Sequence, residues 1–335
     1  MEYLDLPGTL LRASAICLGT AEFGSAISDE QAWELLDAFA AQGGNFVDTA
    51  RVYAAWGPGG MGSSERAIGA WARSRGVRKR IILSTKGAHP ELRTMHISRL
   101  SPEEIAADLM ASLQDLQTDY VDLYWLHRDD PAIPVGEILD VLNEHVESGL
   151  VRSFGASNWS PERLKEAAEY ARTRGRVGFC ASQIAWSLAS INPGTDAGAG
   201  TRTMDDGTRA YHLETSLPIL AYSSQAMGFF SGTYGTDGAA PSTGKAKTVL
   251  RYYLSDDNLG RLSRARELAL RRGRTPNEVA LAYLLSQPFR VFPIVGCRTV
   301  EQVRASCVAN DLRLSPTEMA FLDGSVRSEK VGSPR

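Results

Sequence analysis

Eight short apolar runs, separated by stretches with helical patterning, limit the folds open to this chain more than any other feature. They are rich in β-branched residues and lie at residues 15–19, 45–50, 81–87, 121–127, 151–157, 179–187, 218–224 and 291–296. Runs that stay apolar throughout are typical of strands covered on both faces, and strands that alternate with helices pair in parallel. Because eight parallel strands can close into a barrel, we predict an α/β fold with one (β/α)8 TIM barrel.

An open, doubly wound sheet is the alternative architecture. Such a sheet usually carries GxGxxG after its first strand, whereas the first run here continues as GTAEFG over residues 19–24. This difference favours the barrel. Long polar, glycine-containing stretches follow the sixth and seventh runs, at residues 188–210 and 225–250. Loops after barrel strands form the face on which active sites are built, so we expect both to be functional loops.

Serine residues mark the starts of four helices. Ser28 is followed by Gln31 in a capping-box pattern, and Ser101, Ser160 and Ser315 are each followed by proline and an acidic residue within three positions. A serine hydroxyl can accept a hydrogen bond from the first turn, and proline suits the first helical position. We therefore expect a helix to begin after each of these serines.

The charge balance and the apolar runs exclude two classes of partner. The chain has 39 acidic and 36 basic residues, giving a net charge of -3, so it lacks a basic field for nucleic acid. Its longest apolar run, Val279 to Leu285, is too short to span a bilayer. The first residues show no basic flank followed by an apolar stretch, so no secretory signal is evident. We expect a cytoplasmic protein without nucleic-acid or membrane partners.

Four cysteines, at positions 17, 180, 297 and 307, are far apart and form no CxxC pair. Metal and redox frameworks need ligands at closer, repeated spacing, so we expect buried free thiols and no metal site. We also expect one domain over residues 1–335, ending in a polar, flexible tail at about 324–335.

Asp48, Tyr53, Lys86 and His127 follow or end three successive apolar runs. Each residue alone is weak evidence of a site, because such side chains also cap turns or pack in cores. A barrel, however, brings the carboxyl ends of neighbouring strands together. The four side chains are therefore predicted to form one patch.

This combination of residues suits proton transfer to a carbonyl oxygen. A tyrosine hydroxyl has a pKa of about 10, and a nearby ammonium such as Lys86 should lower it. Asp48 would keep Lys86 charged, and His127 would donate to the substrate oxygen or relay the proton. General acid catalysis contributes about 10²–10⁴-fold. An acid placed over a carbonyl, without a metal or an obvious nucleophile, requires a cofactor that donates hydride.

A series of motifs runs through nearly the whole chain in a specific order. They are Gly19-Thr20, DTAxxY at 48–53, GSSE at 62–65, STKG around Lys86, VDLYWLH ending at His127, GASN at 155–158, Gln183, AYSSQAMGFFSG at 221–232 and PIVGCRT from Pro293. In this order and spacing, the chain resembles the aldo-keto reductase superfamily. The resemblance implies NADPH-dependent reduction of an aldehyde or ketone, or the reverse oxidation, with Tyr53 as general acid and NADH as a possible cofactor.

The resemblance also implies a set of cofactor contacts. They are Gly19, Thr20, Ser157, Asn158, Gln183, Tyr222, Ser223, Gln225, Gly228, Gly296, Arg298, Gln302 and Ser306. By similarity, residues 157, 158 and 183 hold the nicotinamide carboxamide, and the aromatic ring at 222 stacks on the nicotinamide. Residues 223, 225 and 228 match the loop over the pyrophosphate, and 298 and 302 match the segment at the 2′-phosphate.

Several positions depart from the family pattern. Ala54 stands where a glycine commonly follows the tyrosine, and a glycine-rich insertion over 56–62 enlarges that loop. Ser306 replaces the asparagine usually placed against the adenine, and Ala21 replaces a common aromatic residue. These changes concern the preference for substrate and cofactor more than the reaction.

The sequence offers only hints about the substrate. Trp56, Trp125, Trp159 and Trp186 fall near strand ends, where they would form aromatic walls for a sugar-like or aromatic carbonyl compound or would pack between barrel and helices. Arg128 directly follows His127, and we favour an ion pair with Asp129 or Asp130 over a contact with a substrate anion.

Two other functions are compatible with the sequence. The barrel could bind NADPH as a regulatory sensor with little turnover. Less favoured is a Schiff-base aldolase, in which Lys86 would be the nucleophile and would have to be neutral. The sequence leaves the oligomeric state open.

Overall fold

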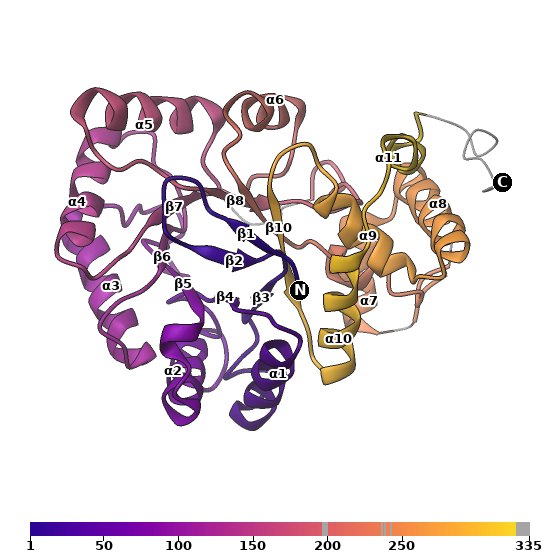
Figure 1. Ribbon diagram of the computed structural model, residues 1–335, viewed down its shortest axis with the longest axis horizontal. Helices are drawn as coiled ribbons and strands as arrows, with labels where there is room; N and C mark the ends of the chain where they lie inside the picture. The colour runs from indigo at the N-terminus through magenta and orange to yellow at the C-terminus, as the bar shows by residue number, and fades with distance from the viewer. Residues whose placement is uncertain (196–199, 236, 238, 242, 326–335) are drawn as a thin grey trace.

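The protein is described here by a computed structural model that covers residues 1–195, 200–235, 237, 239–241 and 243–325. Eight parallel strands form a closed barrel in the order β10-β3-β4-β5-β6-β7-β8-β9 (Figure 1). The strands are β3 (Cys17–Gly19), β4 (Phe46–Asp48), β5 (Ile82–Gly87), β6 (Leu123–Leu126), β7 (Phe154–Ser157), β8 (Ser182–Ala185), β9 (Ile219–Tyr222) and β10 (Val291–Gly296). Each lies within one of the eight apolar runs, so the prediction of a barrel is confirmed.

Helices surround the barrel and cover the outer faces of its strands (Figure 1). They are α1 (Asp29–Ala41), α2 (Ser63–Arg75), α3 (Pro102–Leu116), α4 (Val135–Glu147), α5 (Pro161–Arg174), α6 (Asp206–Thr215), α7 (Gly244–Tyr253), α8 (Asp256–Arg272), α9 (Pro276–Leu285), α10 (Val300–Val308) and α11 (Pro316–Asp323). Short 3₁₀ turns lie at Arg78–Arg80, Ala226–Gly228 and Ala309–Asp311.

The predicted helix starts are confirmed by hydrogen bonds in the first turns. Ser28, Ser101 and Ser315 each form a reciprocal capping box, and the Ser160 side chain accepts a hydrogen bond from the backbone of the first turn of α5. Gly175 then ends α5 in a left-handed conformation with φ 63°. Local sequence is sufficient here because a cap depends only on residues within one turn.

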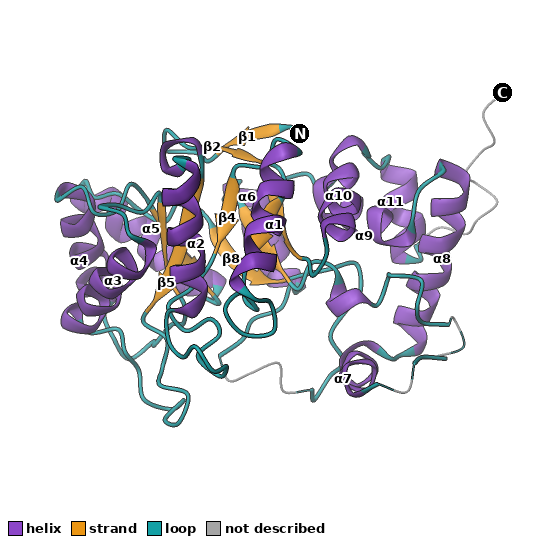
Figure 2. Cartoon of the chain, turned by 90° about the horizontal axis from the view of Figure 1, so that it is seen from below, coloured by secondary structure: helices purple, strands orange, loops and turns teal. Residues whose placement is uncertain are grey.

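A two-stranded hairpin, which the sequence analysis did not predict, closes the amino end of the barrel. It consists of β1 (Tyr3–Asp5) and β2 (Arg12–Ser14), paired antiparallel. Leu6, Leu11 and Ala13 are buried in the same cluster as Phe46 and Phe292 inside the barrel. Figure 2 shows the hairpin at one end of the barrel and the long loops at the other. The amino end is therefore sealed by apolar packing.

The second long loop is shorter than predicted. The stretch over 225–250 includes most of α7, which begins after Thr243, whose side chain accepts a hydrogen bond from Ala246 N at 3.1 Å. Val249 and Tyr253 on this helix are buried in the same cluster as Phe229. Long-range packing thus forms a helix where the sequence is polar and rich in glycine. The loop after β8 extends to α6, close to the predicted limit.

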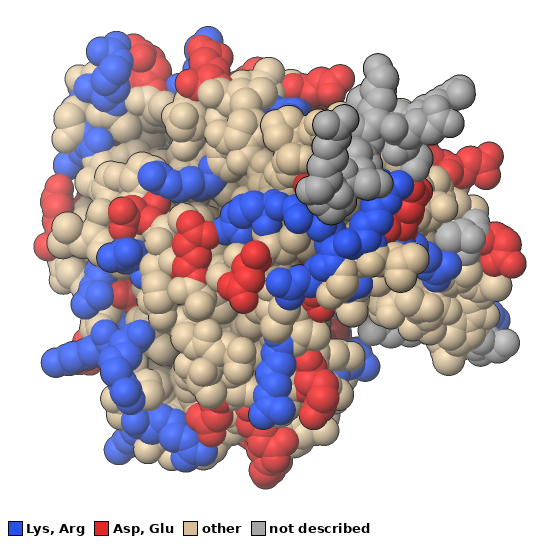
Figure 3. All heavy atoms as spheres, turned by 45° about the vertical axis from the view of Figure 1, so that its right-hand side comes forward, with Lys and Arg blue, Asp and Glu red and all other residues tan. Residues whose placement is uncertain are grey.

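Other sequence expectations concern the surface and the cysteines. All four cysteines are buried and free, as predicted. Among the described residues, no helix is both long and apolar enough to cross a membrane. Acidic and basic side chains are interspersed on the face shown in Figure 3. Most of the predicted flexible tail, residues 326–335, lies outside the described residues.

Candidate active site

Four side chains at or after the ends of three neighbouring strands meet at the carboxyl end of the barrel. Asp48 ends β4, Lys86 lies near the end of β5, and His127 directly follows β6. Lys86 Nζ is hydrogen-bonded to the Asp48 carboxylate and, at 3.1 Å, to the Tyr53 hydroxyl. The Tyr53 and His127 rings lie edge to face with centroids 6.0 Å apart. The structure therefore brings together the four residues that were predicted to form one patch.

Lys86 is a fully buried cation with a complete set of partners. Its ammonium also donates to the Thr49 carbonyl oxygen at 2.7 Å. Burial lowers the pKa of Lys86, but the Asp48 carboxylate and the Tyr53 hydroxyl outweigh this effect, so the pKa lies above its ordinary value. A lysine that stays protonated is a poor nucleophile, which argues against the aldolase reading.

The Asp48 carboxylate is fixed by two further donors. Its Oδ1 atom accepts hydrogen bonds from Ser84 Oγ at 2.7 Å and from Gln183 Nε2 at 3.2 Å. Asp48 is 1% exposed. A buried carboxylate with this many donors keeps one orientation, and so it holds the Lys86 ammonium in place.

The pKa of Tyr53 moves in the opposite direction from the sequence prediction. Lys86 does lower it, but loss of solvation is the larger effect and Asp48 also opposes the lysine, so the pKa of the Tyr53 hydroxyl is raised. The nearby ammonium can be expected from the sequence, whereas the burial of the hydroxyl depends on the packing of the whole site. A raised pKa keeps the hydroxyl protonated at neutral pH, as a proton donor requires.

His127 is a neutral imidazole in this environment. Burial first, and then the positive charge of Lys86, lowers its pKa well below the ordinary value. The His127 ring is not hydrogen-bonded to any other described residue, and its Nδ1 atom is buried. A neutral imidazole free of protein partners can donate a hydrogen bond to a substrate oxygen without carrying a charge.

A second histidine, His89, belongs to the same patch and was missed at the sequence level. Its ring lies edge to face against His127, with centroids 4.7 Å apart, and its Nδ1 atom is 2.7 Å from the Pro90 carbonyl oxygen. The signal was its position three residues after Lys86, in the loop that leaves β5. Burial lowers the pKa of His89, so it adds no charge at neutral pH.

Side chains of the GSSE motif support the strand ends from the first turn of α2. Ser64 Oγ is 2.9 Å from Thr49 Oγ1 and donates to the Thr20 carbonyl oxygen. Thr85, next to Lys86 in β5, donates to the Glu65 carboxylate at 2.5 Å. Burial raises the pKa of Glu65 to about 7. The motif therefore has a structural role beneath the patch formed by Asp48, Tyr53, Lys86 and His127.

The four residues expected at a nicotinamide lie side by side on β7, β8 and β9. Asn158 Oδ1 accepts hydrogen bonds from the Tyr222 hydroxyl at 2.7 Å and from Arg202 N at 3.0 Å. Its Nδ2 atom donates to the His127 carbonyl oxygen at 3.3 Å and to Ser157 Oγ at 3.1 Å. A carboxamide could therefore bind Asn158 only by displacing one of these partners.

Gln183 is better placed than Asn158 to accept a new partner. Its Nε2 atom donates to Asp48, whereas its Oε1 atom has no hydrogen-bond partner among the described residues. Ser157 Oγ donates to the Gln183 carbonyl oxygen at 3.1 Å. These two side chains offer both donors and acceptors at the floor of the site, which a buried carboxamide requires.

The segment after β9 has the backbone expected of an anion-binding loop. Ser223, Ala226, Met227 and Gly228 have φ between 47° and 93°, in the left-handed region. Successive residues of this kind can turn several N–H groups toward one anion. A side chain added at Gly228 would meet nothing within 4 Å, so this part of the loop is open.

Gln225 connects this loop to β10 and α10. Its Oε1 atom accepts a hydrogen bond from Gly296 N at 3.2 Å, and its Nε2 atom donates to Ser306 Oγ at 3.2 Å. Ser306 is 1% exposed, so it lies beneath Gln225 and supports it. Gly296 is exposed and has open space around it.

Arg298 and Gln302 lie at the outer edge of the same region. Gln302 Oε1 accepts a hydrogen bond from Arg298 N at 2.8 Å, and the Arg298 side chain is 52% exposed. An acidic neighbour was not foreseen: Glu22, in the loop after β3, is 3.5 Å from the Arg298 guanidinium. An arginine here suits a phosphate, and the carboxylate would compete with that phosphate.

Gly19 and Thr20, also expected to contact the cofactor, have packing roles. A side chain at Gly19 would come within 2.6 Å of the Ile294 Cγ2 atom, so β3 and β10 need a glycine there. Thr20 is buried, and its hydroxyl donates to the Asp48 carbonyl oxygen at 3.0 Å. Taken together, the residues from β7 to α10 fit a nicotinamide dinucleotide, with Asn158 as the exception.

Three of the four tryptophans near strand ends are buried. Trp125 points into the barrel core, Trp159 is 1% exposed, and Trp186 packs against Tyr283 and Phe289. Trp56, three residues after Tyr53, is 57% exposed. The packing interpretation is therefore correct for three of them, and Trp56 alone is free to contact a ligand.

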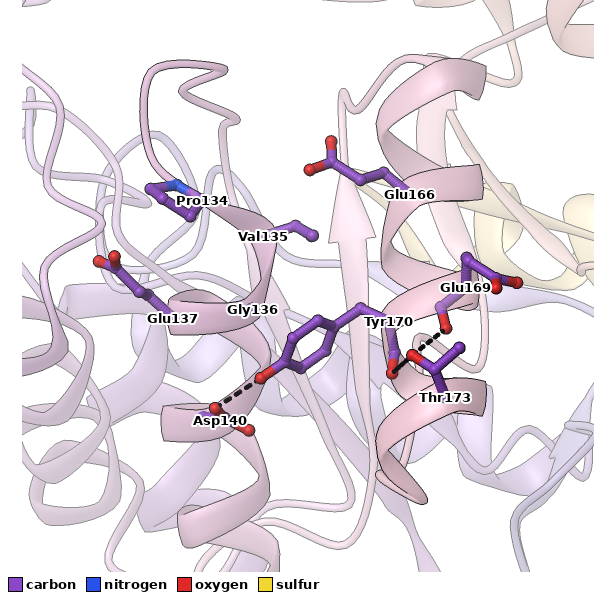
Figure 4. A pocket seen from close by; sticks show the side chains of 9 residues that line it. All are labelled: Pro134, Val135, Gly136, Glu137, Asp140, Glu166, Glu169, Tyr170 and Thr173. Carbon is purple, nitrogen blue, oxygen red and sulfur yellow. Dashed lines mark hydrogen bonds between the residues drawn. The ribbon is translucent and has the colours of Figure 1, made fainter.

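A hollow of about 570 Å³ on the outer helical layer contains none of the predicted site residues (Figure 4). It lies between α4 and α5, where Gly136 leaves room for the Tyr170 ring. The Tyr170 hydroxyl donates to Asp140 at 2.7 Å across the hollow. We interpret it as a packing groove between two helices.

Comparisons with known proteins agree with this site. A family model described as the aldo/keto reductase family matches residues 15–327. An uncharacterized oxidoreductase, YrpG of Bacillus subtilis, is 31% identical over 96% of this chain and 95% of its own length. Norsolorinic acid reductase stcV of Emericella nidulans is 31% identical over 97% of this chain and 81% of its own.

Two further matches give an activity and a solved structure. An aryl-alcohol dehydrogenase [NADP(+)] of Phanerodontia chrysosporium is 28% identical over 97% of this chain and 85% of its own. The crystal structure of a thermostable aldo-keto reductase, Tm1743, in complex with the inhibitor epalrestat has a TM-score of 0.72 and 25% identity, and it covers 97% of this chain and 99% of that one. The similarity therefore extends over whole chains in both sequence and fold.

Proposed function

This chain belongs to the aldo/keto reductase family and is an NAD(P)H-dependent oxidoreductase, and we propose that it reduces an aldehyde or ketone with NADPH and with Tyr53 as the proton donor. The main support is the hydrogen-bonded series from Asp48 through Lys86 to the Tyr53 hydroxyl, beside the neutral ring of His127.

In this proposal each residue has one task. Tyr53 donates its proton to the carbonyl oxygen as negative charge develops there. The buried ammonium of Lys86, 3.1 Å from the hydroxyl, stabilises the phenolate that remains. Asp48 keeps that ammonium charged and oriented, and His127 donates a hydrogen bond to the same oxygen. A bound nicotinamide supplies the hydride, which no side chain of this protein can provide.

The cofactor residues are also part of the proposal. Ser157 and Gln183 would hold the carboxamide, Tyr222 would stack on the ring, and the left-handed segment over 223–228 would bind the pyrophosphate. Arg298 favours NADPH over NADH, because its exposed guanidinium can pair with a 2′-phosphate. An NADP-dependent relative supports the same preference.

The decisive experiment is a titration of the purified protein with NADPH and with NADH, followed by tryptophan fluorescence, and then a panel of aromatic, aliphatic and sugar-like carbonyl compounds. We expect tight NADPH binding and turnover of at least one carbonyl compound. Tight binding without turnover of any compound would support a sensor instead. If neither nucleotide binds, the proposal fails, and borohydride trapping of substrate on Lys86 would then test the aldolase.

A further inference from the structure

Arg128 is a half-buried arginine that follows His127 directly and has no carboxylate partner among the described residues. Arg78 lies 2.8 Å from Asp122, Arg99 lies 2.9 Å from Asp108, and their charges are thereby neutralised. Within the described part of the chain, Arg128 donates one side-chain hydrogen bond, from Nη1 to the carbonyl oxygen of the preceding residue at 2.9 Å, and its buried Nε atom has no partner.

The ion pair predicted for Arg128 is absent from the described residues. Asp129 pairs with Arg163 at 3.2 Å, and Asp130 accepts a hydrogen bond from Ala132 N at 3.0 Å. Sequence proximity suggested the pair, but α5 brings Arg163 to Asp129 from 34 positions away. Neither of the two neighbouring aspartates therefore neutralises the charge of Arg128.

The guanidinium of Arg128 lies within the candidate active site. It interacts electrostatically with Tyr53, His127, His89 and Tyr222, and it affects the pKa of each of them. Its Nη1 atom and the Asn158 amide both donate to the His127 carbonyl oxygen, which places Arg128 next to His127 and Asn158 at the edge of the site.

Packing holds the side chain of Arg128 in this position. Trp159 Nε1 donates to the Arg128 carbonyl oxygen at 3.3 Å, which fixes the backbone. Gly200, in the loop after β8, lies close to the stem: a Cβ atom there would be 3.1 Å from the Arg128 Cδ atom. The stem of Arg128 is therefore restricted by its surroundings, while its remaining N–H donors have no acceptor among the described residues.

A half-buried cation without a counter-ion is unfavourable, since it has lost water and gained no partner. Guanidinium groups bind carboxylates and phosphates through paired N–H donors, which these anions match in shape. We infer that Arg128 forms an oxyanion-binding subsite beside Tyr53, and that the substrate is a carbonyl compound that also bears a carboxylate or a phosphate. This inference rests on the proposed reductase function.

Three para-substituted benzaldehydes test the subsite: 4-formylbenzoate, 4-formylphenyl phosphate and the neutral methyl ester of 4-formylbenzoate. In the wild-type protein we expect a lower KM for one or both anions than for the ester. Arg128→Gln should raise the KM for the preferred anion by about tenfold to a hundredfold, the range for a lost hydrogen bond to a charged group. It should leave the KM for the ester unchanged. The better of the two anions identifies the carboxylate or the phosphate as the ligand.

Two further variants control for charge and shape. Arg128→Lys keeps the charge and should restore part of the affinity for the anion. Arg174→Gln removes one positive charge from the exposed end of α5, and it should change neither KM. A similar loss in Arg174→Gln would show general charge attraction and overturn the subsite.

Other outcomes would also overturn the inference. If Arg128→Gln lowers kcat equally for the anions and the ester and moves the pH profile of kcat, Arg128 acts on Tyr53. If the variant weakens NADPH binding in the fluorescence titration by the same factor, Arg128 belongs to the cofactor site. A wild-type protein that does not prefer either anion would likewise exclude the subsite.

A binding measurement separates this inference from the proposed function. Calorimetry with terephthalate, a dicarboxylate without an aldehyde, requires no turnover. Binding that is lost in Arg128→Gln would support the subsite even if no carbonyl compound is reduced. If reduction of the ester proceeds but terephthalate and both anionic aldehydes bind no better than neutral compounds, the reductase stands and the subsite fails.

Discussion

The two ends of the barrel are filled by different kinds of side chain, apolar at the amino end and charged or polar at the carboxyl end. At the amino end, Leu6, Leu11 and Ala13 of the hairpin region fill the opening with buried apolar atoms. At the carboxyl end, Asp48 and Lys86 bury opposite charges in a polar network. Burial of apolar surface stabilises the amino end. At the carboxyl end, the burial of charged groups carries a desolvation penalty that lowers the stability of the fold.

Residues with a strained backbone conformation also differ between the two ends, because most of them lie at the carboxyl end of the barrel. The described residues other than glycine that have a positive φ are Ala54, Ala88, Gln117, Asn158, Ser216, Ser223, Ala226 and Met227. Six of these eight lie in segments that follow β4, β5, β7 and β9, at the end where the site is. The other two end helices. Strained conformations are common at functional sites, so the two ends should respond differently to mutation.

The largest expected effect is on catalysis at the carboxyl end. Tyr53→Phe removes the proposed proton donor, and we expect kcat to fall by about 10²–10⁴-fold. The free energy of unfolding and the dissociation constant of NADPH should change little, because the ring and its packing remain. Steady-state kinetics, fluorescence titration and urea unfolding would measure these quantities. A kcat near that of the wild type would exclude Tyr53 as the acid.

The second prediction concerns the amino end. Leu6→Ala truncates a fully buried side chain that follows strand β1 of the amino-terminal hairpin. We expect the free energy of unfolding to fall by about 2–5 kcal/mol. Both kcat and KM should stay within a factor of two or so of the wild type at a temperature where the variant is folded. A large loss of kcat in the folded variant would show that the two ends are coupled.

The third prediction tests whether buried charge costs stability at the carboxyl end. Burial raises the pKa of Glu65 from 4.5 to about 7, so the folded protein holds a proton that the unfolded chain releases at lower pH. The free energy of unfolding should therefore fall as the pH rises from about 4.5 through 7, by roughly 3 kcal/mol or less.

The variant Glu65→Gln removes this titrating group while keeping the hydrogen-bonding shape. Its free energy of unfolding should lose that part of the pH dependence, as measured by urea unfolding at several pH values. Leu6→Ala serves as the control, because it lowers stability without changing the slope against pH. Equal slopes in Glu65→Gln and the wild type would show that Glu65 does not titrate in this range.

The smallest expected effect lies at the outer edge of the cofactor region. Glu22→Gln removes the carboxylate that is 3.5 Å from Arg298. Exposed ion pairs of this kind are worth about 0.2–1 kcal/mol, so NADPH affinity should rise by no more than about fivefold. NADH, which lacks the 2′-phosphate, should bind as before. Equal gains for both nucleotides would place Arg298 away from the 2′-phosphate.

Much of the fold could be predicted from the sequence because its determinants are local. Each of the eight strands could be recognised from its apolar residues, and Ser28 and Ser101 determine helix starts within one turn. The grouping of Asp48 and Lys86 was also predictable, since neighbouring parallel strands end on the same face. The hairpin at the amino end was not predicted, because strands of three residues are too short to show a clear alternation of apolar and polar residues.

Other features of the site depended on contacts between distant segments. Asn158 has the amide predicted for the cofactor, but Tyr222 and the loop at Arg202 occupy its oxygen. Arg163 takes the acidic partner expected for Arg128. The residues adjacent in the sequence do not determine which of several possible hydrogen-bond or ion-pair partners a polar side chain will have in the fold.

The sequence by itself determined the eight strands of the barrel, four of the helix caps and the set of residues at the strand ends. The tertiary structure decided how far each of the residues at the strand ends is buried and loses its contact with water. Burial reversed the expected shift in the pKa of Tyr53 and made His127 a neutral donor. The pairing of Asp129 with Arg163 left Arg128 without a carboxylate partner among the described residues. Strand formation and capping depend on neighbours along the chain, whereas desolvation depends on every segment packed around a group, and those segments meet only in the folded barrel.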